Sequence, residues 1–241
     1  MRDAIYADPR LAAIYDPLDT DRTDLVPYLE MVDEFGATSV LDVGCGTGTF
    51  ACILAARGVE VVAVDPAAAS IDVARTKSGA SSVRWIHGDV ASLPPLEVDL
   101  ATMTGNVAQV FVADDEWSAT LIRIRAALRA GGRFVFETRN PARRAWLEWD
   151  AERTHTTTDI DGAGIVTSWC DVVDVNGPLV TYRYTFAFED DGAQIESESV
   201  LRFRDCDELA RSLTSAGFRV ADVRDAPDRP GREFVYVAEA M

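Results

Sequence analysis

The chain has 241 residues, of which 48% are hydrophobic, and its net charge at pH 7 is −17. This length can form one large domain or a domain with an insertion. A chain with so much negative charge repels phosphate backbones and anionic membranes, so we expect no nucleic-acid or membrane partner. The sequence has no run of about 18 apolar residues, an N-terminus unlike a signal peptide, and four cysteines without a C-x-x-C pair. We therefore expect a cytoplasmic protein with no metal site and no disulfide framework.

From residue 39 onward, short apolar runs alternate with helical patterns. The runs that predict buried strands are Ser39–Val43, Val59–Asp65, Val83–His87, Val98–Met103 and Gly131–Thr138. The patterns that predict helices are Gly48–Arg57, Ala67–Lys77 and Asp114–Ala130. Such alternation predicts an α/β fold, in which a parallel sheet carries helices on both faces.

The pattern changes after residue 140. A short helix is predicted around Ala142–Trp149, and turn signals then separate four stretches of alternating polarity: Thr154–Asp159, Ile165–Val175, Leu179–Glu189 and Gln194–Arg204. These predict an antiparallel β insertion. A helix over Asp207–Ala216, capped by Asp207, and two closing strands over 218–225 and 232–240 follow. We predict a core of residues 1–140 and 207–241, and an inserted subdomain of 141–206 that serves as a lid, a substrate site or a dimer contact.

Three glycines at alternate positions follow the first strand, in "VLDVGCGTGTF" from Val40 to Phe50. Glycine permits a positive φ and lets a ligand approach the backbone, and ligands of open α/β sheets bind at the carboxyl ends of the strands. The dinucleotide fingerprint G-x-G-x-x-G would place its third glycine where Thr49 stands. A nicotinamide nucleotide is therefore the alternative ligand, and an oxidoreductase the alternative function.

The stretch around these glycines resembles motif I of the class I S-adenosylmethionine (SAM) dependent methyltransferases. Four further segments match this family in order: "VDPA", "HGDV", "VDLATMTGN" and "LRAGGRFVFET". The resemblance covers about residues 25–138, and it implies a doubly wound, Rossmann-like sheet of seven mostly parallel strands. It also implies SAM as the methyl donor, with S-adenosylhomocysteine (SAH) as the product.

The resemblance also implies which residues bind the cofactor. Asp65 would bind the ribose hydroxyls, Asp89 the adenine amino group, and the backbone of Val90 the adenine ring. Asp42 would orient the ammonium group of the tail. The full predicted set is Tyr15, Asp42, Gly44, Gly46, Gly48, Asp65, Pro66, Asp89, Val90 and Met103.

Each of these roles has a structural alternative. Asp42 and Asp65 could cap the elements that follow them, and Asp89 could be a turn residue. Pro66 departs from the family, which often has an apolar side chain against the adenine at this position. Tyr15, in "IYDPLD", would lie near the sulfonium or the tail if its helix folds over the cofactor; otherwise this helix packs on the edge of the domain.

Methyl transfer from a sulfonium depends mainly on positioning, although a base helps when the acceptor must lose a proton. His155 and Arg139 are the candidates for catalysis and acceptor binding: His155 as a base, or else a solvated surface residue, and Arg139 as a ligand for a carboxylate, or else a loop arginine. His87 is more simply structural. The segment at Asn106 lacks the D/N-P-P-Y/F tetrapeptide, which disfavours a base or glutamine N-methyltransferase.

Aromatic residues of the insertion could line an acceptor pocket, or they could pack the inserted sheet onto the core or a second subunit. They are Trp146, Trp149, Trp169, Tyr182, Tyr184 and Phe186. The sequence thus predicts a SAM-dependent methyltransferase for a small-molecule acceptor, as a monomer or homodimer. An NAD(P)-dependent oxidoreductase and a non-catalytic SAM- or SAH-binding protein are the alternatives. The acceptor and its methylated atom are not predicted.

Overall fold

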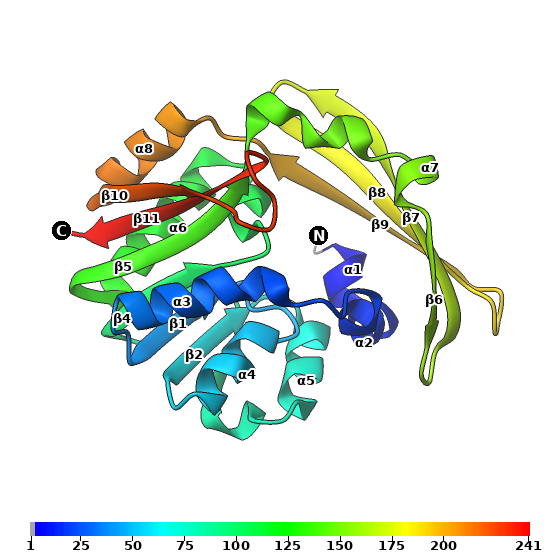
Figure 1. The fold of residues 1–241 in the computed structure, drawn as a ribbon, viewed down its shortest axis with the longest axis horizontal. Helices are drawn as coiled ribbons and strands as arrows, with labels where there is room; N and C mark the ends of the chain where they lie inside the picture. Colours follow the sequence, from blue (N-terminus) through cyan, green and yellow to red (C-terminus); the bar gives the residue numbers. More distant parts are fainter. Residues whose placement is uncertain (1–2) are drawn as a thin grey trace.

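The computed structural model describes residues 3–241, and over that range the chain forms two sheets (Figure 1). The larger, here called the core sheet, has seven strands in the order β10-β11-β5-β4-β1-β2-β3. Its strands are β1 (Ser39–Val43), β2 (Glu60–Asp65), β3 (Val83–His87), β4 (Val98–Met103), β5 (Leu128–Arg139), β10 (Phe218–Asp225) and β11 (Glu233–Ala240). Strands β1 to β5 pair in parallel, and β11 runs antiparallel to both neighbours, β5 and β10. This confirms the predicted fold class.

Helices cover both faces of the core sheet, because its strands are apolar on both sides. They are α3 (Val26–Glu34), α4 (Thr49–Ala56), α5 (Ala68–Thr76), α6 (Asp114–Ala127) and α8 (Cys206–Ser215). On one face, α3 and α4 bury side chains such as Met31 and Leu54 against β1 and β2. On the other face, α6 and α8 pack Ile124 and Leu213 against β4 and β5.

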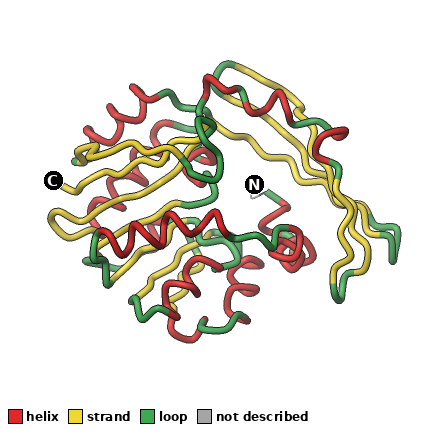
Figure 2. Tube along the Cα trace, in the orientation of Figure 1, coloured by secondary structure: helices red, strands yellow, loops and turns green. Residues whose placement is uncertain are grey.

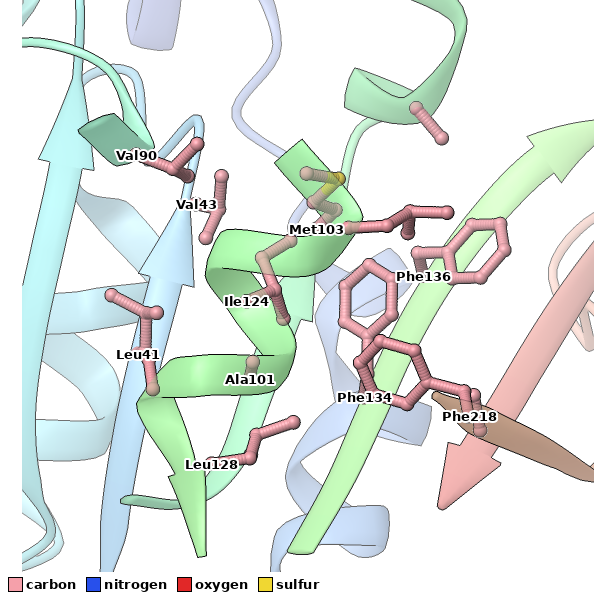
Figure 3. Close-up of a cluster of buried hydrophobic side chains, with 14 of the residues drawn as sticks. Leu41, Val43, Val90, Ala101, Met103, Ile124, Leu128, Phe134, Phe136 and Phe218 are labelled. Atoms are coloured by element: carbon pink, nitrogen blue, oxygen red, sulfur yellow. The ribbon is translucent and has the colours of Figure 1, made fainter. Parts of the chain in front are cut away.

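Aromatic rings fill the second of these faces (Figure 3). Phe134 stacks on Phe136 at a centroid distance of 4.9 Å, and Phe136 stacks on Tyr236 at 5.1 Å. Trp117 of α6 meets Phe136 edge to face at 5.8 Å. Burying one such side chain stabilises the fold by roughly 1.5–3 kcal/mol, so this layer holds the strand ends rigidly.

The inserted sheet has the order β6-β7-β8-β9. Its strands are β6 (Thr156–Ile160), β7 (Gly164–Asn176), β8 (Leu179–Phe188) and β9 (Gln194–Arg202). It arches over the N-terminal helices α1 (Ala4–Ala7) and α2 (Pro9–Leu18), which lie between it and the core (Figures 1 and 2). Leu11 and Ile14 of α2 pack against Phe186 and Phe188. The predicted β insertion is therefore present, and its inner face covers the N-terminal segment.

Three local predictions are wrong. Residues 142–149 form two 3-10 turns, Pro141–Arg143 and Ala145–Glu148, because Arg144 between them has φ 47° and breaks any continuous helix. Asp205, and not Asp207, caps α8, since its side chain accepts from the Glu208 backbone N–H at 2.7 Å. Strand β5 begins at Leu128, before the glycines that were expected to open it.

The remaining short elements connect these layers: η1 (Thr23–Leu25), η2 (Ala80–Ser82), η3 (Val90–Ser92), η4 (Val107–Val110) and α7 (Ala151–Thr154). Within residues 3–241, no helix is long and apolar enough to cross a membrane. The same range holds no group of three or more His, Cys, Asp or Glu side chains that could bind a metal ion.

Candidate functional site

The glycine loop joins β1 to α4 at the carboxyl edge of the core sheet. Gly44 and Gly48 have positive φ and also face close neighbours: a Cβ at Gly44 would lie 2.7 Å from Val107, and one at Gly48 would lie 2.4 Å from Trp85. Gly46 differs, because at φ 53° a Cβ there would meet no atom of residues 3–241 within 4 Å. The outer glycines are thus required by packing, whereas the middle one presents bare backbone to open space.

Asp65, at the end of β2, holds the middle of this loop. Its side chain accepts from the backbone N–H groups of Gly46 at 2.9 Å and Ala67 at 2.7 Å. Helix α5 starts one residue later, with Ala67 at its N-cap position, so Asp65 orders the turn and the glycine loop and does not cap the helix. Asp65 thus places a carboxylate directly beside the backbone of Gly46.

Asp42 lies beneath the same loop and is 1% exposed. Its Oδ1 accepts from the Thr102 hydroxyl at 3.1 Å. Burial raises the pKa of Asp42 to about 7; the Thr102 hydrogen bond opposes this rise and the nearby Asp65 carboxylate adds to it. A cation bound at this edge of the sheet would favour the ionised form of Asp42.

Helix α2 is attached to the glycine loop through Asp16. Oδ1 of Asp16 accepts from the hydroxyls of Thr47 at 2.7 Å and Thr49 at 3.2 Å. Its Oδ2 pairs with the ammonium of Lys77 at 2.6 Å, and Lys77 also donates to Thr49. The neighbouring Tyr15 lies 6.0 Å from the Tyr6 ring. The N-terminal segment therefore folds over the loop, with Asp16 as the attachment point that the sequence did not single out.

The end of β3 places two of the predicted residues beside the loop that follows β2. Asp89 is exposed, and its side chain accepts from Ala91 N–H at 2.9 Å as the N-cap of η3. Val90 is 7% exposed. His87 contacts the carbonyl oxygen of Pro66 at 3.2 Å. The turn role of Asp89 is thus present.

Met103, at the end of β4, is fully buried among apolar side chains that include Val43, Val90 and Phe136 (Figure 3). Its side chain supports the floor of the carboxyl edge. Because the side chain belongs to the hydrophobic core, only the backbone of Met103 is left to contact a ligand at the carboxyl edge.

Arg139 ends β5 and lies near tyrosines from two segments, α1 and β8. Burial raises the pKa of Tyr6 well above its ordinary value; Tyr15 and Tyr182 add to this rise and Arg139 opposes it. Burial also raises the pKa of Tyr184 to about 12, again against the influence of Arg139. The positive charge of Arg139 therefore acts on tyrosines of α1 and of β8 in the inserted sheet.

Partners on the core side hold Arg139 in place. Its Nη1 donates to Gln109 Oε1 at 2.9 Å, and its Nε lies 3.8 Å from Glu233. Its guanidinium carbon lies 5.4 Å from the centre of the Trp149 ring. Glu233 is shared with Arg229, whose Nη1 donates to it at 2.9 Å. Because Glu233 serves two guanidinium groups, Arg139 keeps positive charge for a further anionic partner.

A second buried carboxylate lies beneath Arg139. Glu137 is 8% exposed and accepts from the Tyr28 hydroxyl and from the Asn106 backbone N–H at 3.0 Å. Burial raises the pKa of Glu137, Glu233 adds to the rise, and the Tyr28 hydrogen bond opposes it. Asn106 has φ 60° and donates to Glu233 through Nδ2 at 3.3 Å. The network connects the loop after β4 to β5 and β11.

His155 does not reach this site. It is exposed, and its ring stacks on Trp169 at 6.2 Å. Side chains alternate along a strand, so Trp169 points away from the face that carries the buried Cys170, which pairs with Tyr184. The position fits the surface interpretation of His155 and does not support its role as a base.

The aromatic residues of the insertion divide between packing and the site. Trp146 and Trp149 pack against Phe203, at 4.6 and 6.3 Å, and Phe186 packs onto α2. Tyr182 and Tyr184 lie 6.0 Å apart and belong to the group around Arg139.

A family model described as a methyltransferase domain matches residues 40–132, from β1 through the start of β5. A SAM-dependent methyltransferase from Clostridium acetobutylicum superposes with a TM-score of 0.78 at 18% identity, covering 96% of this chain and 98% of that one. Residues 40–132 thus match the methyltransferase-domain family, and the whole chain has the fold of SAM-dependent methyltransferases. SAM is the cofactor of this family, as predicted, and the residues at the carboxyl edge fit it: Gly46 has no close neighbour among residues 3–241, and the Asp65 carboxylate lies beside it.

Two further proteins are similar to this chain. The cypemycin N-terminal methyltransferase of a Streptomyces species is 32% identical over 119 residues, 49% of each protein, so the chain spans about half the length of this curated relative. SAM-bound CalS10, an amino pentose methyltransferase from Micromonospora echinaspora, has a TM-score of 0.69 at 19% identity, covering 92% of this chain and 93% of that one.

Several residues of this candidate site were not predicted from the sequence: Tyr6, Asp16, Tyr28, Lys77, Gln109 and Glu233. Only Asp16 had a local signal, since it follows Tyr15 in the "YD" pair. The others are polar residues whose partners lie far away along the chain.

Proposed function

We propose that this protein binds SAM at the glycine loop and transfers its methyl group to a small-molecule acceptor held beneath the inserted sheet. The geometry of Gly46 and Asp65 carries the proposal: bare backbone at φ 53° lies beside a carboxylate that is held in place by two backbone N–H groups. SAM supplies a methyl group already activated by its sulfonium. The chain's contribution is to bind, orient and enclose the two reactants.

Each part of the cofactor has a complementary group in this proposal. Asp65 accepts from the ribose hydroxyls, and Asp89 with the Val90 backbone receives the adenine, beside Pro66. Asp42, ionised when a cation lies near it, orients the ammonium group of the tail. Tyr15 and the Asp16 contact close the N-terminal helix over the bound molecule, because Asp16 already bonds to Thr47 and Thr49 of the loop.

The acceptor in this proposal lies between the strand ends and the inner face of the inserted sheet. Arg139 offers a charge-assisted contact to a carboxylate or other anionic group of the acceptor, and the hydroxyls of Tyr6, Tyr182 and Tyr184 surround that position. An amine nitrogen is the acceptor atom that we would test first, because a neutral amine attacks through its own lone pair and needs no general base to remove a proton beforehand. The cypemycin and amino pentose methyltransferases, whose names indicate amine-bearing acceptors, support this choice.

Calorimetric titration with SAH, NAD⁺ and NADP⁺ tests the proposal. We expect SAH to bind with a Kd of about 1 µM and the nicotinamide nucleotides not to bind. Asp65→Ala should weaken SAH binding about a hundredfold, since it removes charge-assisted hydrogen bonds. Asp72→Ala, which removes the same charge from the exposed side of α5, is the matched control and should bind SAH normally.

Two outcomes would replace the proposal. Heat with NAD⁺ and none with SAH would favour the oxidoreductase. Tight SAH binding without SAH formation from SAM, across a panel of small amines, hydroxy acids and thiols, would favour the non-catalytic binding protein.

A further inference from the structure

A hollow of about 390 Å³ lies between α6 and α8, next to the end of β9. Three arginines line it, Arg202, Arg204 and Arg211, together with the carboxylates of Asp114 and Glu208. None of these residues belongs to the glycine loop or to the group around Arg139. The hollow is therefore separate from the proposed cofactor and acceptor positions.

Arg204 is the unusual residue of this hollow. Its side chain is 2% exposed, yet its Nε, Nη1 and Nη2 atoms form no well-aligned hydrogen bond with any part of residues 3–241. The nearest carboxylate oxygens are those of Glu208 at 3.3 Å and Asp114 at 3.8 Å, and the guanidinium carbon lies 5.2 Å from the centre of the Trp117 ring. A buried guanidinium whose donors are this poorly paired is costly, and such groups in native proteins usually have a water or an ion as partner.

Arg202 takes the better contacts with both carboxylates. Its Nη2 donates to Glu208 at 2.7 Å, and its Nη1 lies 2.9 Å from Asp114. Arg211 is exposed at the rim, and within residues 3–241 it forms no ion pair. Three guanidinium groups thus share two carboxylates, and the hollow carries excess positive charge in a chain whose net charge is −17.

We propose that this hollow binds a tetrahedral oxyanion, such as phosphate or sulfate, either free or as the charged end of a small organic molecule. Arg204 would donate from the base and Arg211 from the rim, and the hydroxyls of Ser118 and Ser215, which also line the hollow, would supply neutral donors. Planar guanidinium groups match two oxygens of such an anion at once. The volume lies within the range of small-molecule sites, so an organic group attached to the anion would also fit.

Titration with inorganic phosphate against sodium chloride at matched ionic strength tests this site. We expect phosphate to raise the Tm and to bind measurably by calorimetry, and Arg211→Ala to weaken phosphate binding about tenfold. Arg123→Ala is the matched control, because Arg123 is an exposed arginine of α6 outside the hollow. It removes the same charge and should leave phosphate binding unchanged.

A second ligand, glycerol 3-phosphate, distinguishes the two sources of the anion. If glycerol 3-phosphate binds more tightly than inorganic phosphate, the result supports the site with an organic phosphate as its ligand. If the two bind equally, it supports the site with the free anion as its ligand. Equal Tm shifts with phosphate and chloride would overturn the proposal. So would equal losses in Arg211→Ala and Arg123→Ala, which would mean that only the overall charge matters. Arg204→Gln removes the buried guanidinium and should abolish binding; if this variant does not fold, the Arg211 and Arg123 pair decides.

Discussion

Asp42 is buried at the end of β1, and replacing it with asparagine should change protein stability in a way that depends on pH. Burial raises the pKa of this carboxyl from 3.8 to about 7, so the folded protein retains a proton that the unfolded chain releases above pH 4. The folded state then binds more protons than the unfolded state between about pH 4 and pH 7. In that window the free energy of unfolding falls as the pH rises.

The size of the effect follows from the two pKa values. Their difference is about 3 units, and at 1.36 kcal/mol per unit the ionisation of Asp42 costs about 4 kcal/mol once the pH exceeds 7. About 2–3 kcal/mol of that cost develops between pH 5 and pH 8. Asparagine has nearly the same shape and can still accept from the Thr102 hydroxyl, but it does not ionise. The free energy of unfolding of Asp42→Asn, relative to that of the wild type, should therefore rise by about 2–3 kcal/mol from pH 5 to pH 8.

Urea denaturation of both proteins at pH 5, 6, 7 and 8, without cofactor, measures this difference. Asp115→Asn, at an exposed position in the first turn of α6, is the control and should show no such change with pH. A difference between wild type and Asp42→Asn that stays constant from pH 5 to pH 8 would refute the reasoning. It would show that Asp42 ionises at its ordinary pKa in the folded protein.

Two further substitutions test the contacts around the site. Asp16→Asn keeps an acceptor for Thr47 but loses the charge that pairs with Lys77. Because that pair is partly exposed, the free energy of unfolding should fall by less than about 1 kcal/mol. SAH should dissociate several-fold faster from this variant in stopped-flow measurements. An unchanged dissociation rate would mean that α2 does not close over the cofactor. Tyr28→Phe removes a donor to the buried Glu137 and should cost about 1–3 kcal/mol of stability, more at pH 8 than at pH 5, because the lost hydrogen bond favours the ionised carboxylate. An equal loss at both pH values in urea denaturation would contradict this assignment.

Local patterns were sufficient to predict the core of the fold. Strands β1, β3 and β4 lie at the predicted residues, because each is a short apolar run between turn residues, and such a run reads the same in any tertiary context. The glycine loop could also be predicted, since Gly44 and Gly48 combine positive φ with a neighbour so close that a Cβ would clash with it. Boundaries failed where tertiary pairing decides them: β5 begins at Leu128 because that residue pairs with Val98 of β4.

The sequence by itself thus determined the α/β class, the β insertion, the position of the glycine loop and the resemblance to methyltransferases. Only the tertiary structure decided which distant side chains meet at the sites. Asp16 reaches Thr47 because α2 lies between the inserted sheet and the loop, and His155, at the end of α7, is exposed and lies against Trp169. Arg204 becomes a buried, underpaired cation only where α6, α8 and the end of β9 come together. Periodicity and turn residues act over a few neighbouring positions and can be recognised in the sequence. Contacts between distant side chains depend on the path of the chain between them.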